Sequence, residues 1–165
     1  MTISEVLLPE FDEEMASTRR LLERVPSEKG QWKPHPKSFS LGHLTQLVCW
    51  MPGWITNTLT ETELNLSGAS PYSYEKTEDL LAMFDRNVRE ARAAIEASKD
   101  ADYEVNWSLK VGDRVVLTQP RRAIVRNHIN HLCHHRGQLT VYLRLIDVPL
   151  PSIYGPTADE RPAGF

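Results

Sequence analysis

Four histidines stand close together in residues 126–139, which read RNHINHLCHHRGQL. They are His128, His131, His134 and His135, out of six histidines in the whole chain. Histidine is the side chain that most often binds metal ions or moves protons near neutral pH. The cluster therefore predicts metal binding or proton transfer, provided that one element holds the side chains on a common face.

An α-helix would bring two of the four histidines together. At about 100° per residue, His131 and His135 lie one turn apart and about 40° apart around the axis, so both imidazoles can reach one metal ion, as in the HExxH motif. His128 shares this face but lies about 10 Å from His135 along the axis. Because Zn–N bonds are about 2.1 Å long, those two histidines cannot easily hold one ion. His134 points about 100° away from His135.

A metal site needs a third protein ligand. The candidates are His43, on a predicted helix that should face the last one, and His35 in the loop before it. No Asp or Glu occurs in residues 120–146, so the histidine pair has no carboxylate base on its own helix. The alternative is that the histidines are hydrogen-bonded in the core without a metal.

Helical periodicity predicts the elements that position these residues. Apolar side chains recur at helical spacing in residues 3–25 and 40–60, in a third segment that begins at Thr77, and in residues 120–146. Ser4, Ser40 and Thr77 are the expected N-caps of the first three helices, and Pro120 suits the start of the fourth.

Residues 103–120 follow a different pattern. They read YEVNWSLKVGDRVVLTQP, in which apolar and polar side chains alternate on both sides of Gly112-Asp113. This pattern predicts a β-hairpin or an extended loop. The expected fold class is therefore all-α, a four-helix bundle with a short β-hairpin or extended loop between the third and fourth helices, in a single domain spanning residues 1–165.

Composition excludes several classes of protein. The net charge is −3 and the pI about 6.1, which argues against a nucleic-acid binder. No apolar run approaches the roughly 18 residues of a membrane helix, and the first residues lack the basic start of a signal peptide. A cytoplasmic location is expected. Cys49 and Cys133 each stand alone in apolar patterns and are expected to be buried thiols rather than a disulfide.

Three stretches of the chain carry a resemblance to a known family. They are LLPEFDEEMASTRRLLERVP (residues 7–26), WKPHPKSFSLGHLTQLVCWMPGW (residues 32–54) and NHLCHHRGQLTVYLRLIDVPLPSIYGPTADE (residues 130–160). Together they resemble the DinB-like, damage-inducible proteins over nearly the whole chain, and the HxxxHRGQL run is the most specific part. The resemblance implies a four-helix bundle, usually a homodimer, with a divalent metal (zinc or nickel) held by three histidines.

The metal ligands implied by the resemblance are only partly present. Two correspond to His131 and His135, while the third normally lies four residues after His43, where this chain has Leu47. Three possibilities follow: His43 serves as a ligand from one turn away, displaced by about 6 Å along the helix; a carboxylate or water replaces the third histidine; or the metal site is lost.

The resemblance also implies a class of reaction. Characterised relatives include thiol transferases that use bacillithiol or mycothiol and a maleylpyruvate isomerase, in which the metal lowers the pKa of a bound thiol. The expected function is metal-dependent transfer of a low-molecular-weight thiol to a small electrophile. Arg136 and Tyr142 are candidates for binding the small-molecule substrate, with packing as the alternative for each. The alternative function is a metal-free, dimeric binding or stress-related module that lost its ligand at Leu47. A metal-bound hydroxide hydrolase ranks lowest, because no acidic general base is evident.

Overall fold

The computed structural model describes residues 1–67, 72 and 76–161. The described part of the chain contains four α-helices, a small sheet and two short 3₁₀ helices, Ser27–Lys29 and Asp100–Glu104. The α-helices are α1 (Ile3–Leu22), α2 (Leu41–Thr60), α3 (Thr77–Ala97) and α4 (Arg121–Leu145), and the strands are β1 (Glu63–Asn65), β2 (Asn106–Val111) and β3 (Arg114–Pro120). The predicted four-helix bundle is confirmed, and so is the hairpin between α3 and α4.

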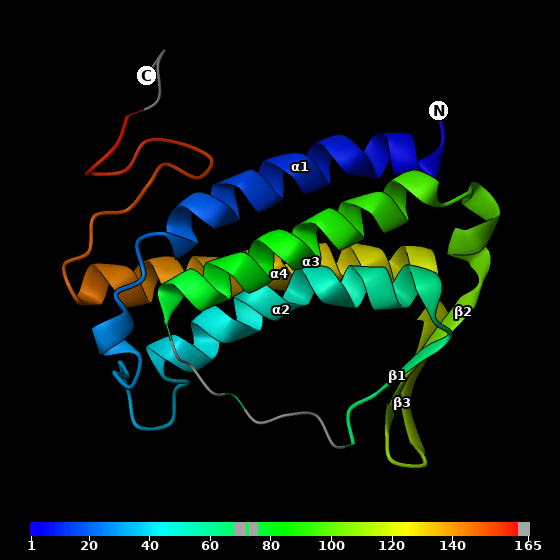
Figure 1. Ribbon diagram of the computed structural model, residues 1–165, viewed down its shortest axis with the longest axis horizontal. Helices are drawn as coiled ribbons and strands as arrows, with labels where there is room; N and C mark the ends of the chain where they lie inside the picture. The colour runs from blue at the N-terminus through cyan, green and yellow to red at the C-terminus, as the bar shows by residue number, and fades with distance from the viewer. Residues whose placement is uncertain (68–71, 73–75, 162–165) are drawn as a thin grey trace.

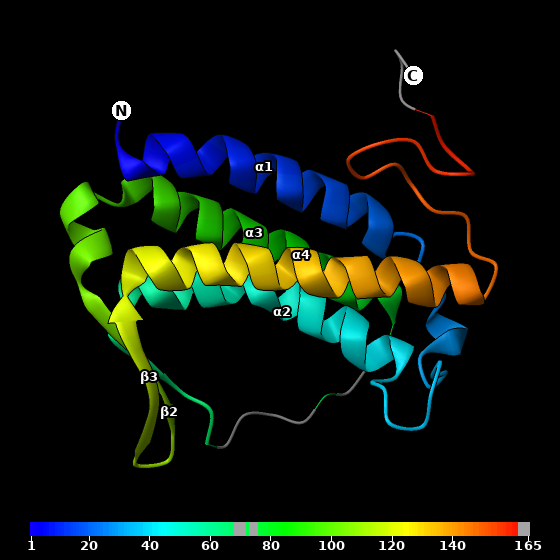
Figure 2. The same ribbon diagram turned by 180° about the vertical axis from the view of Figure 1, so that it is seen from behind.

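The helices form a bundle in which α2 packs against both α3 and α4, and α1 packs against the same two helices (Figures 1 and 2). The side chains between them are apolar and include Phe11, Met51, Phe84 and Ile129, each at most 2% exposed. The sheet lies at the end of the bundle that holds the N-terminus, and the segment after α4 runs back along the other end. No helix in the described ranges is long and apolar enough to cross a membrane.

The N-termini of the helices differ in part from the predicted caps. Ser40 caps α2 as expected, since its hydroxyl accepts a hydrogen bond from the third residue of the helix. The cap predicted for α1 is wrong: Thr2 and Glu5 form a reciprocal capping box, which places Ser4 inside the first turn. Thr77 is the first residue of α3 rather than its cap.

The hairpin carries a third strand that the sequence did not predict. Strands β2 and β3 pair antiparallel around Gly112, which has a positive φ of 61°, and β1 pairs parallel with β2. The Asn65 side chain joins β1 to the turn, because it accepts a hydrogen bond from Gly112 N–H (3.1 Å) and donates one to the Gly112 carbonyl (3.0 Å). A strand of three residues is too short to show a periodic pattern, so no local signal predicts β1.

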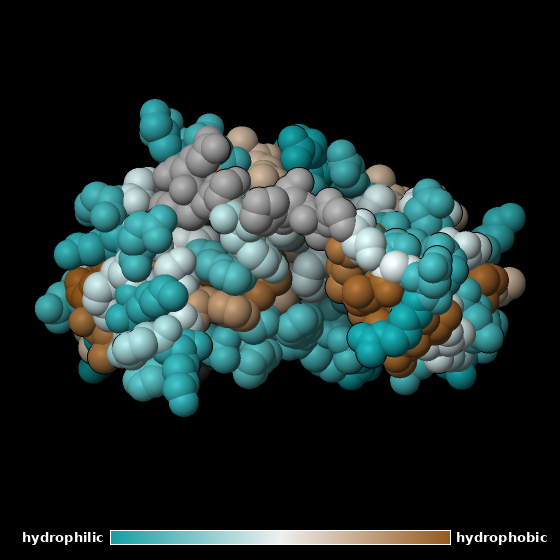
Figure 3. Space-filling model, turned by 90° about the horizontal axis from the view of Figure 1, so that it is seen from below, coloured by the Kyte–Doolittle hydropathy of each residue, from teal (hydrophilic) through white to brown (hydrophobic). Residues whose placement is uncertain are grey.

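The register of the sheet aligns three leucines. Leu64 on β1 lies opposite Leu109 on β2, which lies opposite Leu117 on β3. Apolar surface gathers at the end of the molecule that holds the sheet, at the right of Figure 3. Three valines on the two long strands, Val111, Val115 and Val116, are exposed.

Candidate functional site

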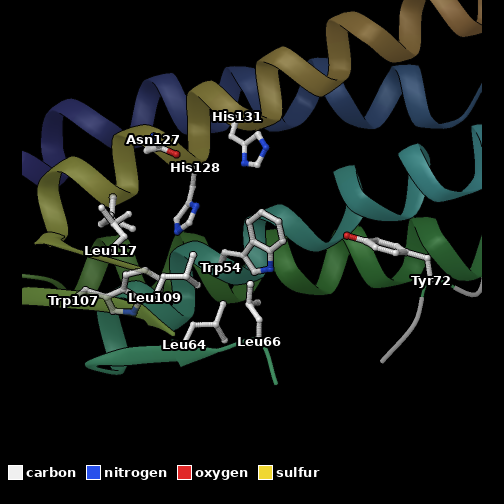
Figure 4. Close-up of a pocket in the computed structure, with 11 residues that line it drawn as sticks. Trp54, Leu64, Leu66, Tyr72, Trp107, Leu109, Leu117, Asn127, His128 and His131 are labelled. Atoms are coloured by element: carbon white, nitrogen blue, oxygen red, sulfur yellow. The ribbon is translucent and has the colours of Figure 1, made fainter. Parts of the chain in front are cut away.

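A cavity of about 340 Å³ lies between the sheet, α2 and the first half of α4 (Figure 4). Its walls are almost entirely apolar, and none of the described residues that line it is Asp, Glu, Lys or Arg. This size and character suit a small neutral molecule, because a charged one would lose its hydration without gaining a partner. The lining residues are Trp54, Leu64, Leu66, Tyr72, Trp107, Leu109, Leu117, Ile124, Asn127, His128 and His131.

The floor of the cavity is the row of leucines in the sheet. Leu64, Leu109 and Leu117 face α4, and Trp107 on β2 continues this surface. The Trp107 indole N–H donates to Asn57 Oδ1 on α2 at 3.1 Å, which fixes the ring and ties the sheet to the bundle. The floor therefore depends on β1, the strand that the sequence did not predict.

The histidine pair on α4 lies at the edge of this cavity. His131 Nε2 and His135 Nε2 are 3.0 Å apart, and His135 Nδ1 is 2.7 Å from Gln138 Oε1. Because the Gln138 oxygen is an acceptor, His135 carries its hydrogen on Nδ1 and presents a bare Nε2. His131 must then donate its Nε2–H to His135. The predicted meeting of these two imidazoles is confirmed.

Both imidazoles of the pair favour their neutral form. Burial lowers the pKa of His131, and positive charge on His135 or His134 would lower it further. Burial also lowers the pKa of His135, although its hydrogen bond to Gln138 acts in the opposite direction. At neutral pH the pair therefore carries no charge. His131 Nε2–H and His135 Nε2 bond to each other, so His131 Nδ1 is the nitrogen of the pair that can accept a proton from a bound hydroxyl or thiol group.

His128 lies deeper in the same cavity, which the sequence analysis did not predict. Its ring points away from α4, between Trp54 on α2 and Trp107 on β2 (Figure 4), with ring centroids 5.7 and 6.2 Å away. Its Nε2 is 3.1 Å from Thr58 Oγ1. Burial, with a smaller contribution from His131, lowers the pKa of His128 to about 4. The spacing of three residues from His131 was the available signal, since it places both side chains on one face of α4.

Acid should destabilise the fold through His128. The unfolded chain takes up a proton at this residue below pH 6.5 and the folded chain only below about pH 4, so the free energy of unfolding falls as the pH drops between these values. The loss from this one residue is about 3 kcal/mol at the acid end. Urea denaturation from pH 7 to pH 4 measures it, and a His128→Phe variant should lose less stability over that range. An equal loss in both proteins would assign the effect to other groups.

His43, the proposed third metal ligand, lies away from the pair in a stack of aromatic rings. Its ring is sandwiched between Phe39 (centroids 4.1 Å apart) and Tyr72 (3.6 Å apart). Among residues 1–67, 72 and 76–161, no three His, Cys, Asp or Glu side chains lie close enough together to hold one metal ion. Leu47, at the position where the resemblance implies a third ligand, is 6% exposed and part of the core.

Arg136 and Tyr142, the predicted substrate-binding residues, are not among the residues that line the cavity. The Arg136 side chain is 2% exposed and forms an ion pair of 2.6 Å with Glu14 on α1. It also donates to the Tyr154 hydroxyl at 2.6 Å, which joins the segment after α4 to the bundle. Tyr142 donates to the Phe39 carbonyl at 3.3 Å. In this structure both side chains hold elements together, and substrate contact stays a prediction for each.

The remaining cysteine and histidine predictions have mixed outcomes. Cys49 and Cys133 are both free thiols, and Cys49 is fully buried. Cys133 is only partly buried and donates to Glu14 Oε2 at 3.2 Å. His134 is exposed on α4 and contacts His135 edge-on, with centroids 5.0 Å apart. His134 therefore lies outside the cavity.

Fold and site together define a class: helical-bundle proteins with a small-molecule cavity beside a pair of histidines on the last helix. The chain belongs to the DinB family, whose family model matches residues 1–162. The resemblance noted from the sequence is thus confirmed over nearly the whole chain.

Three relatives illustrate the similarity. The chain is 25% identical over 157 residues to the uncharacterized protein YrdA of Bacillus subtilis (strain 168), covering 93% of this chain and 89% of YrdA. The crystal structure of a DinB-like protein from Bacillus cereus ATCC 10987 matches with a TM-score of 0.72 and 22% identity, covering 93% of this chain and 98% of that one. The B. subtilis DinB-like protein YjoA matches with a TM-score of 0.68 and 22% identity, covering 88% and 95%. At these identities the structural matches establish the shared fold.

Proposed function

We propose that the protein binds a small, neutral, largely apolar molecule in the cavity, with a polar group of that molecule meeting the histidine pair. The observation that carries the proposal is a cavity of about 340 Å³ whose described lining has no Asp, Glu, Lys or Arg, and at whose edge His131 Nε2 lies 3.0 Å from His135 Nε2. The leucine floor and two tryptophans supply apolar contact, and His131 Nδ1, which carries no hydrogen, supplies a proton acceptor. We extend the proposal to a homodimer, as the family resemblance implies.

Benzothiophene is a suitable first probe, because it is flat, apolar and uncharged. In ¹H–¹⁵N spectra, we expect it to shift the indole N–H signals of Trp54 and Trp107, which line the cavity, and to leave that of Trp32 in place. Trp32 is a built-in control, since it packs against Tyr142 rather than lining the cavity.

Two neighbouring substitutions on β3 sharpen this test. Leu117→Trp fills the cavity and should abolish the shifts of Trp54 and Trp107. Val116→Trp adds the same ring on the open face of the strand, where Val116 is 50% exposed, and should leave them intact. If benzothiophene moves no indole signal, or moves that of Trp32 as much as the other two, the cavity is not a binding site for such molecules.

A second candidate is metal-dependent transfer of a low-molecular-weight thiol. It is favoured by the two facing Nε2 atoms, and by the hydrogen bond from His135 Nδ1 to Gln138, since metal-binding histidines commonly donate their second N–H to an oxygen. Bound zinc or nickel would supply a lowered thiol pKa. His131 and His135 would hold the metal, with His43 or an external group as third ligand.

The described residues fit only two of the three ligand positions that this second candidate needs. The third family position is Leu47, and His43 is engaged in ring stacking. We therefore place the metal-dependent candidate second. Zinc uptake by the wild-type chain and by a Leu47→His variant separates the two candidates, because only the second requires the wild-type chain to hold a metal.

A further inference from the structure

The hydrogen bond between Thr58 and His128 fixes which nitrogen of His128 carries the hydrogen. The Thr58 hydroxyl has a single hydrogen, and it donates that hydrogen to the Trp54 carbonyl at 2.9 Å. Thr58 Oγ1 can therefore only accept in its 3.1 Å contact with His128 Nε2. The hydrogen of the neutral His128 ring is consequently on Nε2, and Nδ1 is a bare acceptor.

This acceptor lacks a partner in the described part of the chain. His128 Nδ1 is buried and makes no hydrogen bond to any described residue. The nearby indole N–H of Trp107 is already donated to Asn57. Buried polar atoms are nearly always hydrogen-bonded in folded proteins. Because His128 is one of the residues that line the cavity, a ligand that shifts its ring slightly can complete this missing hydrogen bond.

We propose that His128 Nδ1 selects cavity ligands that carry a hydrogen-bond donor, an O–H or N–H group on a flat, neutral ring. This inference rests on the proposed function and names the class of ligand for the same cavity. A flat ring in the ligand suits Trp54 and Trp107, which flank His128. A neutral ligand suits the described lining, which has no Asp, Glu, Lys or Arg. Phenols and indoles have this chemistry, with the donor at the edge of the ring.

Indole and benzothiophene test the selection, because they share shape and size and differ in whether N–H or sulfur occupies one ring position. We expect the wild-type chain to bind indole about 10-fold more tightly than benzothiophene, or better, because benzothiophene leaves the acceptor unpaired. Titrations followed by the ¹H–¹⁵N signals of Trp54 and Trp107 give both dissociation constants.

A His128→Phe variant is the matched control, since it keeps an aromatic ring and removes the acceptor. It should bind benzothiophene at least as well as the wild type and lose the preference for indole. A second measurement needs no variant: the ¹⁵N spectrum of the wild-type imidazoles should show His128 with hydrogen on Nε2, and indole should move the Nδ1 signal in the direction of a hydrogen-bonded acceptor.

The outcomes separate the two proposals. Equal affinity for the two probes in the wild type overturns the selection by His128 and leaves the cavity proposal standing. A water molecule held on Nδ1 would produce this equal affinity. A preference for indole that persists in His128→Phe also overturns it, because the indole N–H then binds elsewhere, for example at His131 Nδ1. If neither probe binds the wild type, the cavity proposal fails and this inference fails with it.

Discussion

A Leu47→His variant is expected to bind one zinc ion per chain far more tightly than the wild type. The substitution restores a third histidine at the family position, on a helix that packs against α4, where His131 and His135 already face each other at 3.0 Å. Direct ligands contribute more than the roughly 10–100-fold that outer-shell partners add to metal affinity. We therefore expect an increase above 100-fold, measured by competition with a chromogenic chelator on protein without a histidine tag.

Stability provides an independent readout of the same variant. Leu47 is 6% exposed, so without metal the new polar ring should lower the free energy of unfolding by about 1–3 kcal/mol. Zinc should recover this loss, because a ligand that binds only the folded state stabilises it. A Leu47→Phe variant, with a ring but no nitrogen, should gain no zinc affinity, and Leu47→His combined with His131→Ala should lose what was gained.

Two results would change this interpretation. If Leu47→His binds zinc no better than Leu47→Phe, position 47 does not reach the histidine pair, and the family's ligand geometry does not apply to this chain. If the wild type already holds one zinc per chain and His131→Ala removes it, the metal-dependent candidate becomes the leading one. His43 or an external group is then the third ligand.

Replacing Glu14 by alanine is expected to cost about 3–5 kcal/mol of stability. The Arg136 guanidinium is 2% exposed, and the Glu14 carboxylate, 2.6 Å away, is its counter-ion. Glu14 also accepts hydrogen bonds from the Tyr154 hydroxyl (2.7 Å) and the Cys133 thiol (3.2 Å). The substitution leaves a buried charge unpaired and releases the segment after α4. Urea denaturation at pH 7 measures the loss.

Glu13→Ala is the matched control for Glu14→Ala. It makes the same change one position away on an exposed side of α1 and should alter stability by less than about 0.5 kcal/mol. An equally small effect of Glu14→Ala would show that Arg136 finds another partner or reaches water when the carboxylate is removed.

Acid should weaken the same contact. Burial alone would raise the pKa of Glu14, but the hydrogen bonds from Tyr154 and Cys133 and the charge of Arg136 outweigh it and lower the pKa. The stabilisation is therefore complete above the carboxyl's ordinary pKa and is lost as the pH falls through the lower folded-state value. Glu14→Ala should be less sensitive to pH than the wild type in that acid range.

The sequence predicted best the features that depend on neighbours within one element. The pairing of His131 with His135 follows from the helical repeat alone, and the structure bears it out. Gly112 predicted the hairpin turn, because such turns need a positive φ that glycine adopts easily. The φ of Gly112 in the structure is 61°. Ser40 marked the start of α2 through a hydroxyl that accepts a hydrogen bond three residues on.

Features that join distant parts of the chain were predicted less well. Strand β1 is three residues long and exists because β2 lies beside it, so no local pattern announces it. The cavity floor depends on that strand, and so does the cavity in which His128 lies. Arg136 was a candidate for substrate contact because its position on the helix could be predicted. Its ion pair with Glu14 could not be predicted, because Glu14 lies 122 residues earlier in the chain.

By itself, then, the sequence determined the four helices, the hairpin, the histidine pair and the DinB family, since helical periodicity, turn chemistry and a conspicuous run of residues are all local. Tertiary structure alone decided that His43 stacks between Phe39 and Tyr72 and that Leu47 lies in the core. It also decided that His128 lines an apolar cavity with a buried nitrogen that has no partner among the described residues. The physical reason is that a side chain's direction along its own helix is set by backbone geometry. What it meets there depends on how separate elements pack around a shared core.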